Sequence, residues 1–256
     1  MPNPRRRLLG VVAVLCAVVT SALVPVAAQA SGQYPTGRTG IDISYPSCSR
    51  VIAPGVPFGI VGVNGGRPYS DNPCAAAEAH AFTNVSLYVN TGLYTGGSFF
   101  AKAMAYGGCA AKDRSCGAYW YGYLAGLEAY RYAKAQGLAG AATWWLDVEV
   151  MNDWSTSTAL NDRSILGEHQ AIADLTPATG TRPRAVIGVY ARAGEWSTIT
   201  GGGLATRHWP VWLATGLTKQ TTTQLARFCT KSFTASKVQI VQWIGPGTLN
   251  DLDYGC

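Results

Sequence analysis

The sequence predicts one α/β domain folded as a closed, TIM-like (β/α) barrel. Three observations lead to this prediction: short apolar runs alternate with segments of helical character, seven or eight such runs occur, and neither an internal repeat nor a low-complexity linker divides the chain. Nearly continuous apolar runs between helices indicate parallel strands that are buried on both faces. So many strands in one domain of this length favour a closed barrel over an open sheet.

The first thirty residues, 1–30, predict a cleaved export signal. Three arginines at 5–7 precede an apolar run over residues 8–26, and an A-x-A element follows at 28–30. This order is that of a secretory signal. Polar residues and a proline interrupt the run, whereas a membrane anchor needs about 20 apolar residues. We therefore expect a domain of residues 31–256 without a stable membrane anchor, exported by the general or the twin-arginine route.

The expected elements follow from apolar patterning. Seven runs are expected as strands: residues 40–44, 58–63, 85–89, 144–148, 185–190, 211–214 and 238–243. Three segments are expected as helices: residues 75–82, 119–136 and 160–175. In the second of these, Leu124, Leu127, Tyr130 and Ala133 recur at helical spacing, and Gly137 ends the pattern. Connections are shorter in the last third of the chain, so the closing strands are expected to lack full helices.

Charge limits the classes of partner. The chain has 20 Lys and Arg against 14 Asp and Glu, a formal charge of +6, which becomes 17 − 14 = +3 without the three arginines at 5–7. No cluster of Lys and Arg remains, which excludes a strongly basic nucleic-acid-binding protein. A small positive charge is compatible with an acidic polymer such as a bacterial wall.

Cysteine usage indicates disulfides. Six cysteines remain once Cys16 leaves with the signal: Cys48, Cys74, Cys109, Cys116, Cys229 and Cys256. An even number in an exported chain indicates three disulfides. Only a short loop separates Cys109 from Cys116, so we expect that pair, and the pairing of the other four stays open. No C-x-x-C spacing occurs, which disfavours a metal site.

Two carboxylates stand in the apolar run over residues 144–150. If the run is a strand, Trp145, Asp147 and Glu149 share one face, because residues two apart point to the same side. Like charges this close raise the pKa of one carboxyl, which gives the protonated state that a general acid requires. A pair that is solvated at a strand edge or bound to arginine is an equally open alternative.

Further acids fall where strands end. Asp42 lies near the end of the first run, and Asp251 and Asp253 follow the last run after a Gly-Pro-Gly turn. Catalytic side chains of parallel barrels project from the carboxyl ends of strands, so an acidic ring at one mouth is expected. Four aromatic residues also lie at or near strand ends: Trp145, Tyr190, Trp212 and Trp243. Together these features indicate glycan hydrolysis, although Asp42 alone suits a turn and each tryptophan alone suits the core.

Other chemistries lack their motifs. No G-x-S-x-G element occurs, and none of the three histidines is placed for a Ser-His-Asp triad, so acyl transfer is not expected. Residues 62–66 are rich in glycine but lack the following Lys-Ser/Thr of a phosphate-binding loop.

Five short motifs occur in order along the chain: Gly40-Ile41-Asp42-Ile43-Ser44, Asp147-Val148-Glu149, Gly188-Val189-Tyr190, Val211-Trp212-Leu213-Ala214, and Gln242-Trp243 followed by Asn250-Asp251-Leu252-Asp253. In this order, with barrel-like spacing, they resemble glycoside hydrolase family 25, the Chalaropsis-type lysozymes. The resemblance covers most of the domain, from Gly40 to Tyr254.

The resemblance implies a flattened β/α barrel that cleaves the β-1,4 bond after N-acetylmuramic acid in peptidoglycan, without a metal or a cofactor. Carried over by motif, Glu149 would be the general acid/base. Asp147 would orient the acetamido group of the substrate, whose oxygen acts as the nucleophile and gives retention. Asp42 and Asp251 would complete the acidic ring, and Tyr190 would contact the reacting sugar. Four further side chains are expected to bind substrate: Trp145, Trp212, Gln242 and Trp243.

Two segments depart from the family pattern. Tyr45, within residues 44–48, stands where the family usually has a W-Q-G-like element, and Asn64, within residues 63–66, stands where it has Thr/Ser-Glu-Gly. Both are expected at the mouth, in contact with substrate. The alternative is a non-catalytic or differently specific wall-glycan-binding protein on the same barrel, but a binder has no need of the intact acidic set. The expected partner is peptidoglycan or a related N-acetylated polysaccharide, bound by a monomer that is secreted, extracellular or wall-associated.

Overall fold

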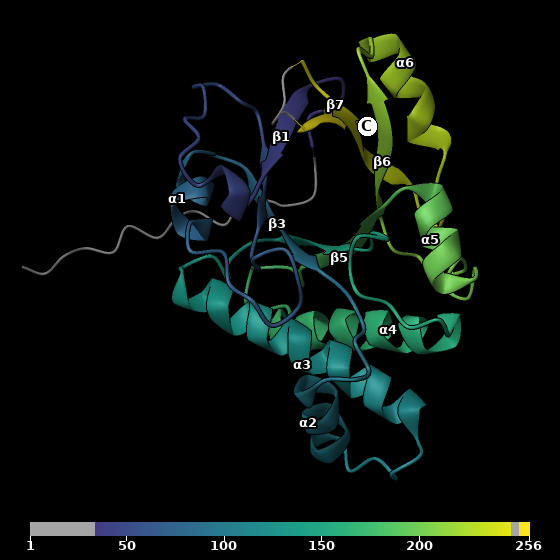
Figure 1. The fold of residues 1–256 in the computed structure, drawn as a ribbon. Coiled ribbons are helices and arrows are strands. Elements are labelled where there is room, and N and C mark those ends of the chain that lie inside the picture. Colours follow the sequence, from purple (N-terminus) through teal and green to yellow (C-terminus); the bar gives the residue numbers. More distant parts are fainter. Residues whose placement is uncertain (1–33, 247–250) are drawn as a thin grey trace, which may run out of the picture.

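The computed structural model describes residues 34–246 and 251–256, so the expected signal at 1–30 lies outside the described residues. A closed barrel of eight strands forms its centre (Figure 1). In chain order the elements are β1 (Thr39–Ile43), η1 (Tyr45–Ser47), β2 (Gly59–Gly62), α1 (Ala75–His80), β3 (Val85–Asn90), α2 (Ser98–Tyr106), α3 (Arg114–Ala135), β4 (Thr143–Asp147), α4 (Thr158–Leu175), β5 (Val186–Ala191), α5 (Ala193–Thr200), β6 (Val211–Thr218), α6 (Thr222–Ala226), η2 (Arg227–Thr230), β7 (Val238–Ile244) and β8 (Asp251–Gly255). The prediction of a closed α/β barrel is confirmed.

The strands are not all parallel. β1 to β7 run parallel, each beside the next in the chain. β8 is antiparallel to both β7 and β1 and closes the barrel. The expectation of a parallel sheet thus holds for β1 to β7 and not for β8, which was not expected as a strand. Only residues 245–250 separate β7 from β8, whereas a parallel crossover needs about a dozen residues or more. As a result, β8 begins at the barrel end where the other strands finish.

Helices cover the barrel unevenly (Figure 1). The long helices α3 and α4 pack side by side, and α4 contacts β4 and β5. By contrast, only η1 links β1 to β2, short α6 and η2 link β6 to β7, and no helix is described between β7 and β8. The expectation that the closing strands lack full helices is confirmed. Helices α2, α5 and α6 were not expected.

Helix α3 begins earlier than its apolar pattern indicates. It starts at Arg114, five residues before the expected position 119. Asp113 precedes it, and its side-chain oxygen accepts a hydrogen bond from the backbone N–H of Cys116 at 2.9 Å. Such a cap satisfies a donor of the first turn that would otherwise lack a partner, and so stabilises the earlier start.

Glycines allow α3 and α4 to approach closely. A methyl group at Gly122 of α3 would lie 1.8 Å from the backbone oxygen of Ser164, and one at Gly167 of α4 would lie 1.9 Å from that of Tyr119. No side chain fits at either position. The close approach also lets the Ser164 hydroxyl donate to the backbone oxygen of Gly92 at 2.7 Å. The helix pair thereby holds the segment that follows β3.

Apolar side chains fill the inside of the barrel. Eight of them pack together there: Tyr34, Phe58, Ile60, Trp145, Tyr190, Trp212, Ala214 and Ile240. Alternate strand residues point outward and join a larger core beneath the helices. Trp145 has no exposed surface, and its Nε1 donates to the Tyr34 hydroxyl at 2.9 Å. The interior is packed, as in other eight-stranded barrels, so a ligand can be reached only from the ends.

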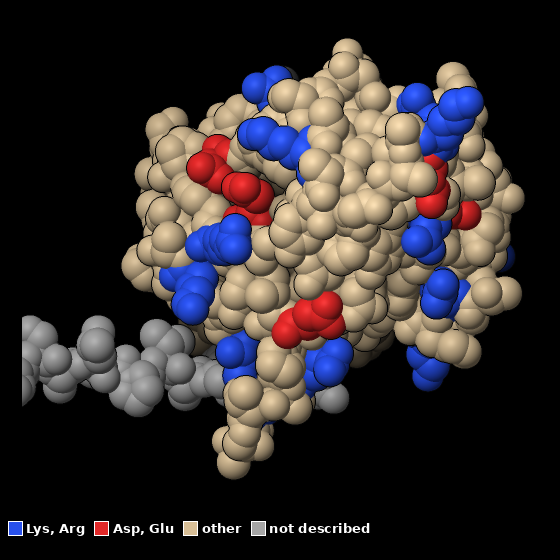
Figure 2. All heavy atoms as spheres, turned by 90° about the horizontal axis from the view of Figure 1, so that it is seen from below, with Lys and Arg blue, Asp and Glu red and all other residues tan. Residues whose placement is uncertain are grey.

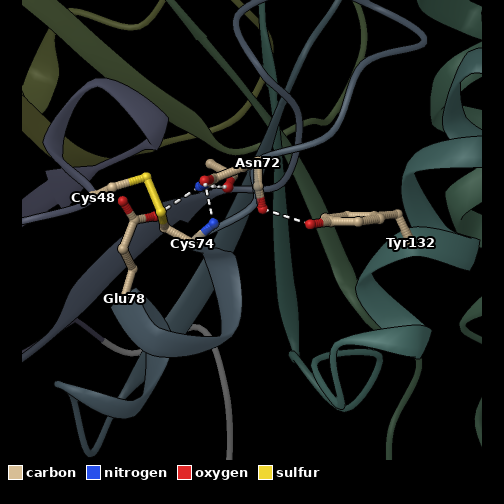
Figure 3. The surroundings of a disulfide bond; sticks show 6 residues. Cys48, Asn72, Cys74, Glu78 and Tyr132 are labelled. Atoms are coloured by element: carbon tan, nitrogen blue, oxygen red, sulfur yellow. Dashed lines mark hydrogen bonds between the residues drawn. A yellow bond between two sulfur atoms is a disulfide. The ribbon is translucent and has the colours of Figure 1, made fainter.

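Three disulfides join Cys48 to Cys74, Cys109 to Cys116, and Cys229 to Cys256. The expected pair of Cys109 and Cys116 is confirmed. The first bond ties the segment after β1 to the start of α1 (Figure 3). Beside it, the Asn72 amide donates to the backbone oxygen of Gly62 and to Glu78, both at 2.7 Å, while the Asn72 backbone oxygen accepts from the Tyr132 hydroxyl at 2.6 Å. The two segments that follow β1 and β2 are thus held together.

The face of the molecule seen in Figure 2 has no single charged region. Lysine and arginine side chains are spread over the face seen in Figure 2, with acidic side chains in small groups among them. Within the described ranges, no helix is long and apolar enough to cross a membrane. The three disulfides fit a protein that resides in an oxidising, extracellular environment.

Candidate active site

Acidic side chains gather at the barrel end where the parallel strands finish. Asp42 comes from β1, Asp147 ends β4, Glu149 follows it, and Asp251 and Asp253 come from β8. For four of them, Asp42, Asp147, Glu149 and Asp253, the pKa is raised by the charge of at least one other carboxyl in the group. The four carboxyls expected as an acidic ring, together with Asp253, therefore lie within one site.

Asp147 is held deep in this site. Its side chain is only 4% exposed, and Oδ2 accepts a hydrogen bond from Nδ2 of Asn90, which lies opposite it on β3. Asn64, in the segment after β2, supports Asn90: its Oδ1 accepts from the Asn90 backbone N–H at 2.8 Å and its Nδ2 donates to the Asn90 backbone oxygen at 3.3 Å. Asn64 thus positions a partner of Asp147, and the sequence motifs did not identify Asn90.

The other oxygen of Asp147, Oδ1, has no hydrogen-bond partner in the described part of the chain. Burial raises the pKa of Asp147 well above its ordinary value, and the neighbouring Glu149 and Asp42 raise it further. Both effects disfavour the ionised form of this carboxyl in the free protein. A buried polar atom without a partner costs free energy unless a ligand supplies one, so Oδ1 is a candidate contact for substrate.

Glu149 lies beyond the end of β4, so the expectation that it shares a strand face with Asp147 is wrong. The chain turns after Asp147, and the Trp154 indole fixes this turn by donating to the Glu149 backbone oxygen at 2.8 Å. The carboxyl nevertheless points to the same centre, because its Oε1 lies 3.0 Å from the Tyr190 hydroxyl. Burial raises the pKa of Glu149, and the Tyr190 hydroxyl partly opposes this effect.

Gln242 connects Asp42 with Tyr190. Its Nε2 donates to Asp42 Oδ2 at 2.9 Å, and its Oε1 accepts from the Tyr190 hydroxyl at 2.8 Å. Burial, reinforced by the charge of Asp251, raises the pKa of Asp42 to about 7. Gln242 is therefore part of the polar centre, although its amide is already occupied by protein partners.

The two carboxyls of β8 differ in exposure. Asp251 is exposed at the start of the strand, and the positive charges of Arg50 and Arg192 oppose the rise in pKa that partial burial causes. Asp253 is fully buried, and its Oδ1 accepts from the Trp212 indole at 2.7 Å. Burial and the neighbouring Asp42 raise the pKa of Asp253 well above its ordinary value. Asp251 is thus the accessible member of the pair.

Helix α5 supplies charges that sequence reasoning missed. Arg192 precedes the helix and lies 3.9 Å from Glu195, whose Oε2 accepts from the Val150 backbone N–H at 3.3 Å. Glu195 raises and Arg192 lowers the pKa of Glu149. A usable signal was present, since Arg192 stands two residues after Tyr190 at the end of an expected strand.

The structure does not support sugar contacts for two of the expected aromatic residues. Trp145 has no exposed surface, so it cannot offer a face to a ligand. Trp243 packs against the outer core, on the side of β7 opposite to Gln242. Trp212 is 2% exposed, and its indole donates a hydrogen bond to Asp253. Tyr45 lies on the rim of the mouth beside Gly66 and is 44% exposed. Tyr190 is 8% exposed, and its hydroxyl is hydrogen-bonded to the Glu149 carboxyl.

Comparisons with known proteins give one finding about the fold. No protein-family model matches the sequence, and no curated protein matches it significantly. The fold resembles that of a bacterial lysozyme. The solved structure of the lysozyme from Streptomyces coelicolor matches with a TM-score of 0.48 and 17% identity, over 87% of this chain and 93% of that one. This likeness does not bear on individual residues.

The site combines two features that acid–base chemistry requires. Glu149 is a partly accessible carboxyl with a raised pKa, which can give a proton to a bound group and take one back. Beside it, Asp147 offers an oxygen that has no hydrogen-bond partner within residues 34–246 and 251–256. In the described ranges, no three His, Cys, Asp or Glu side chains are arranged to hold a metal ion.

Proposed function

We propose that the protein is a glycan hydrolase that cleaves β-1,4 bonds of peptidoglycan and retains the anomeric configuration. The observation that carries the proposal is Glu149, a carboxyl with a raised pKa at the mouth of the barrel, beside the buried Asp147, whose Oδ1 has no partner among the described residues. The order of sequence motifs from Gly40 to Tyr254 supports peptidoglycan as the polymer.

In the first step Glu149 would donate its proton to the oxygen of the scissile bond. The bond between that oxygen and C1 of the sugar breaks, and the acetamido oxygen of the same sugar forms a bond to C1. Asp147 Oδ1 would accept a hydrogen bond from the acetamido N–H, which orients the group. The positive charge that develops on the acetamido group favours the ionised form of Asp147.

In the second step water would attack C1 from the face that the leaving group vacated. Glu149, now a carboxylate, takes a proton from that water and returns to its starting state, and the acetamido oxygen leaves C1. Two displacements at the same carbon give net retention. The proton and the water are balanced over the cycle, so no cofactor is needed.

The test is the release of new reducing ends from insoluble peptidoglycan by the wild-type protein and by Glu149→Gln. We expect Glu149→Gln to lower turnover by about 10²- to 10⁴-fold, the usual value of general-acid catalysis, with unchanged binding to the polymer. Glu128→Gln, on the exposed face of α3, is the matched control and should keep full activity. Equal turnover of Glu149→Gln and wild type would overturn the assignment.

A second arm tests the nucleophile. Peptidoglycan from which the N-acetyl groups have been removed should bind but not be cleaved, because the acetamido oxygen is then missing. Cleavage of that polymer at the normal rate would contradict the mechanism. Binding of intact peptidoglycan without any new reducing ends would instead favour a wall-binding protein.

A further inference from the structure

Four side chains form an unbroken chain of hydrogen bonds across the mouth of the barrel. It runs from Asp42 on β1 to Gln242 on β7 (2.9 Å), to Tyr190 on β5 (2.8 Å) and to Glu149 after β4 (3.0 Å). Gln242 and Tyr190 are 9% and 8% exposed, so little water can replace one member of the chain as a partner. The hydrogen bonds must therefore be satisfied largely within it.

The number of protons in this chain is limited by Tyr190. Its hydroxyl has one hydrogen, yet it lies within hydrogen-bond distance of Glu149 Oε1 and of Gln242 Oε1. When the Gln242 amide nitrogen donates to Asp42, the Gln242 amide oxygen faces Tyr190 and accepts the one hydrogen bond that the Tyr190 hydroxyl can donate. The contact between Tyr190 and Glu149 then needs a proton on Glu149, which donates to the phenol oxygen. In this arrangement Glu149 is protonated and Asp42 is ionised.

The reverse arrangement has the same connections. If the Gln242 amide turns by half a rotation, its nitrogen donates to the Tyr190 oxygen and its oxygen needs a donor on Asp42. Tyr190 then donates to Glu149. In this arrangement Asp42 is protonated and Glu149 is ionised. The amide nitrogen and oxygen are told apart only by their hydrogen-bond partners. Both arrangements therefore fit the same positions of the heavy atoms.

We propose that Gln242 and Tyr190 are positioning residues that make Glu149 and Asp42 share a single proton. When Glu149 gives its proton to the leaving oxygen, the amide of Gln242 turns, Tyr190 donates to the new carboxylate, and Asp42 takes a proton from water. When Glu149 regains a proton from the attacking water, Asp42 returns its proton to the solvent. No proton crosses the amide, and none is gained or lost over the cycle.

This coupling rests on the proposed function only in calling Glu149 the proton donor, because the sharing itself is a property of the free protein. Other ionisable groups also act on the two ends of the chain. Those that face it from the surrounding elements are Tyr88, Asp147, Arg192, Glu195, Asp251 and Asp253. They stay the same in the variants compared below, so differences between these variants report on the chain.

The test measures the pKa of both carboxyls by NMR in the free protein, with ¹³C-labelled Asp and Glu side chains. In Gln242→Met, Tyr190 can donate only to Glu149, so we expect the pKa of Glu149 to fall by about one unit. Asp42 loses the donor of Gln242, so its pKa should rise by a similar amount. Loss of a polar neighbour alone would raise both values, so a joint rise, or no change, would overturn the proposal.

Two further measurements complete the test. Gln239→Met makes the same substitution on the same strand outside the hydrogen-bond chain, and it should move neither pKa. Asp42→Asn should lower the pKa of Glu149 more in the wild-type background than in the Gln242→Met background. The Gln242→Met protein has already lost the amide that couples the two carboxyls. Equal effects in the two backgrounds would refute the coupling. Activity of Glu149→Gln decides the proposed function separately.

Discussion

Replacing Glu168 by glutamine should flatten the pH dependence of the stability of this protein. Glu168 lies on α4, packed against α3, and is only 1% exposed. Burial raises its pKa from 4.5 to about 8, although Thr91 lowers it somewhat. The carboxyl is therefore neutral in the folded protein at pH 7, where the unfolded chain carries it as a carboxylate.

The magnitude follows from linkage. A carboxyl whose pKa is raised on folding stabilises the folded state fully below its unfolded pKa, and this stabilisation is lost as pH rises through the folded pKa. Between pH 4.5 and about 8, Glu168 should lower the free energy of unfolding by about 1.4 kcal/mol per pH unit. Over that window the total is on the order of 4 kcal/mol, a large share of the stability of a typical domain.

Urea unfolding followed by tryptophan fluorescence, at several pH values between about 5 and 8, measures this effect. The other buried carboxyls contribute equally to both proteins, so the difference between wild type and Glu168→Gln isolates this residue. We expect the variant to gain stability relative to wild type as pH rises. Glu128→Gln, on the exposed side of α3, should show no such trend. A difference between wild type and Glu168→Gln that stays constant over the range would refute the reasoning.

Three other predictions follow from contacts at the site and in the helix pair. Turnover should be lost at alkaline pH as Glu149 ionises, and Arg192→Met should move this limb of the pH–rate profile to higher pH, because Arg192 lowers the pKa of Glu149. An unchanged or lower limb would contradict this. Gly122→Ala should cost about 1–3 kcal/mol by chemical denaturation, whereas Gly194→Ala, whose added Cβ would meet no described atom within 4 Å, should cost nothing. An NMR time course of cleavage should show the retained anomer first; early appearance of the inverted anomer would point to Asp42 or Asp251 as a base that activates water.

Much of the fold could be read from residue order, because strands buried on both faces have a local signature. All seven expected apolar runs overlap strands, and the three expected helices overlap α1, α3 and α4. β8 escaped detection because it combines two aspartates, a tyrosine and a glycine, and its strand conformation comes from pairing with β1 and β7. Helix α5 escaped because it has only eight residues.

The sequence predicted the place of site residues whose chemistry requires a partner. It did not predict the side of a strand to which the aromatic side chains point. Carboxylates in apolar runs are costly unless they meet a partner, so Asp42 and Asp147 could be placed at the mouth. Tryptophans carry no such signal, because an aromatic side chain suits the core and a sugar-binding face equally well. Trp145 therefore turned out to fill the interior and Trp243 to face outward.

By itself the sequence determined which segments become strands, which acids stand at their ends, and that Cys109 would join Cys116, because each of these depends on neighbours along the chain. The tertiary structure alone decided that β8 runs antiparallel, that Asn64 supports Asn90, and that Gln242 bridges Asp42 and Tyr190. These features join residues up to 200 positions apart. They depend on closure of the barrel, which sets the register of distant strands and so determines which polar atoms must become partners.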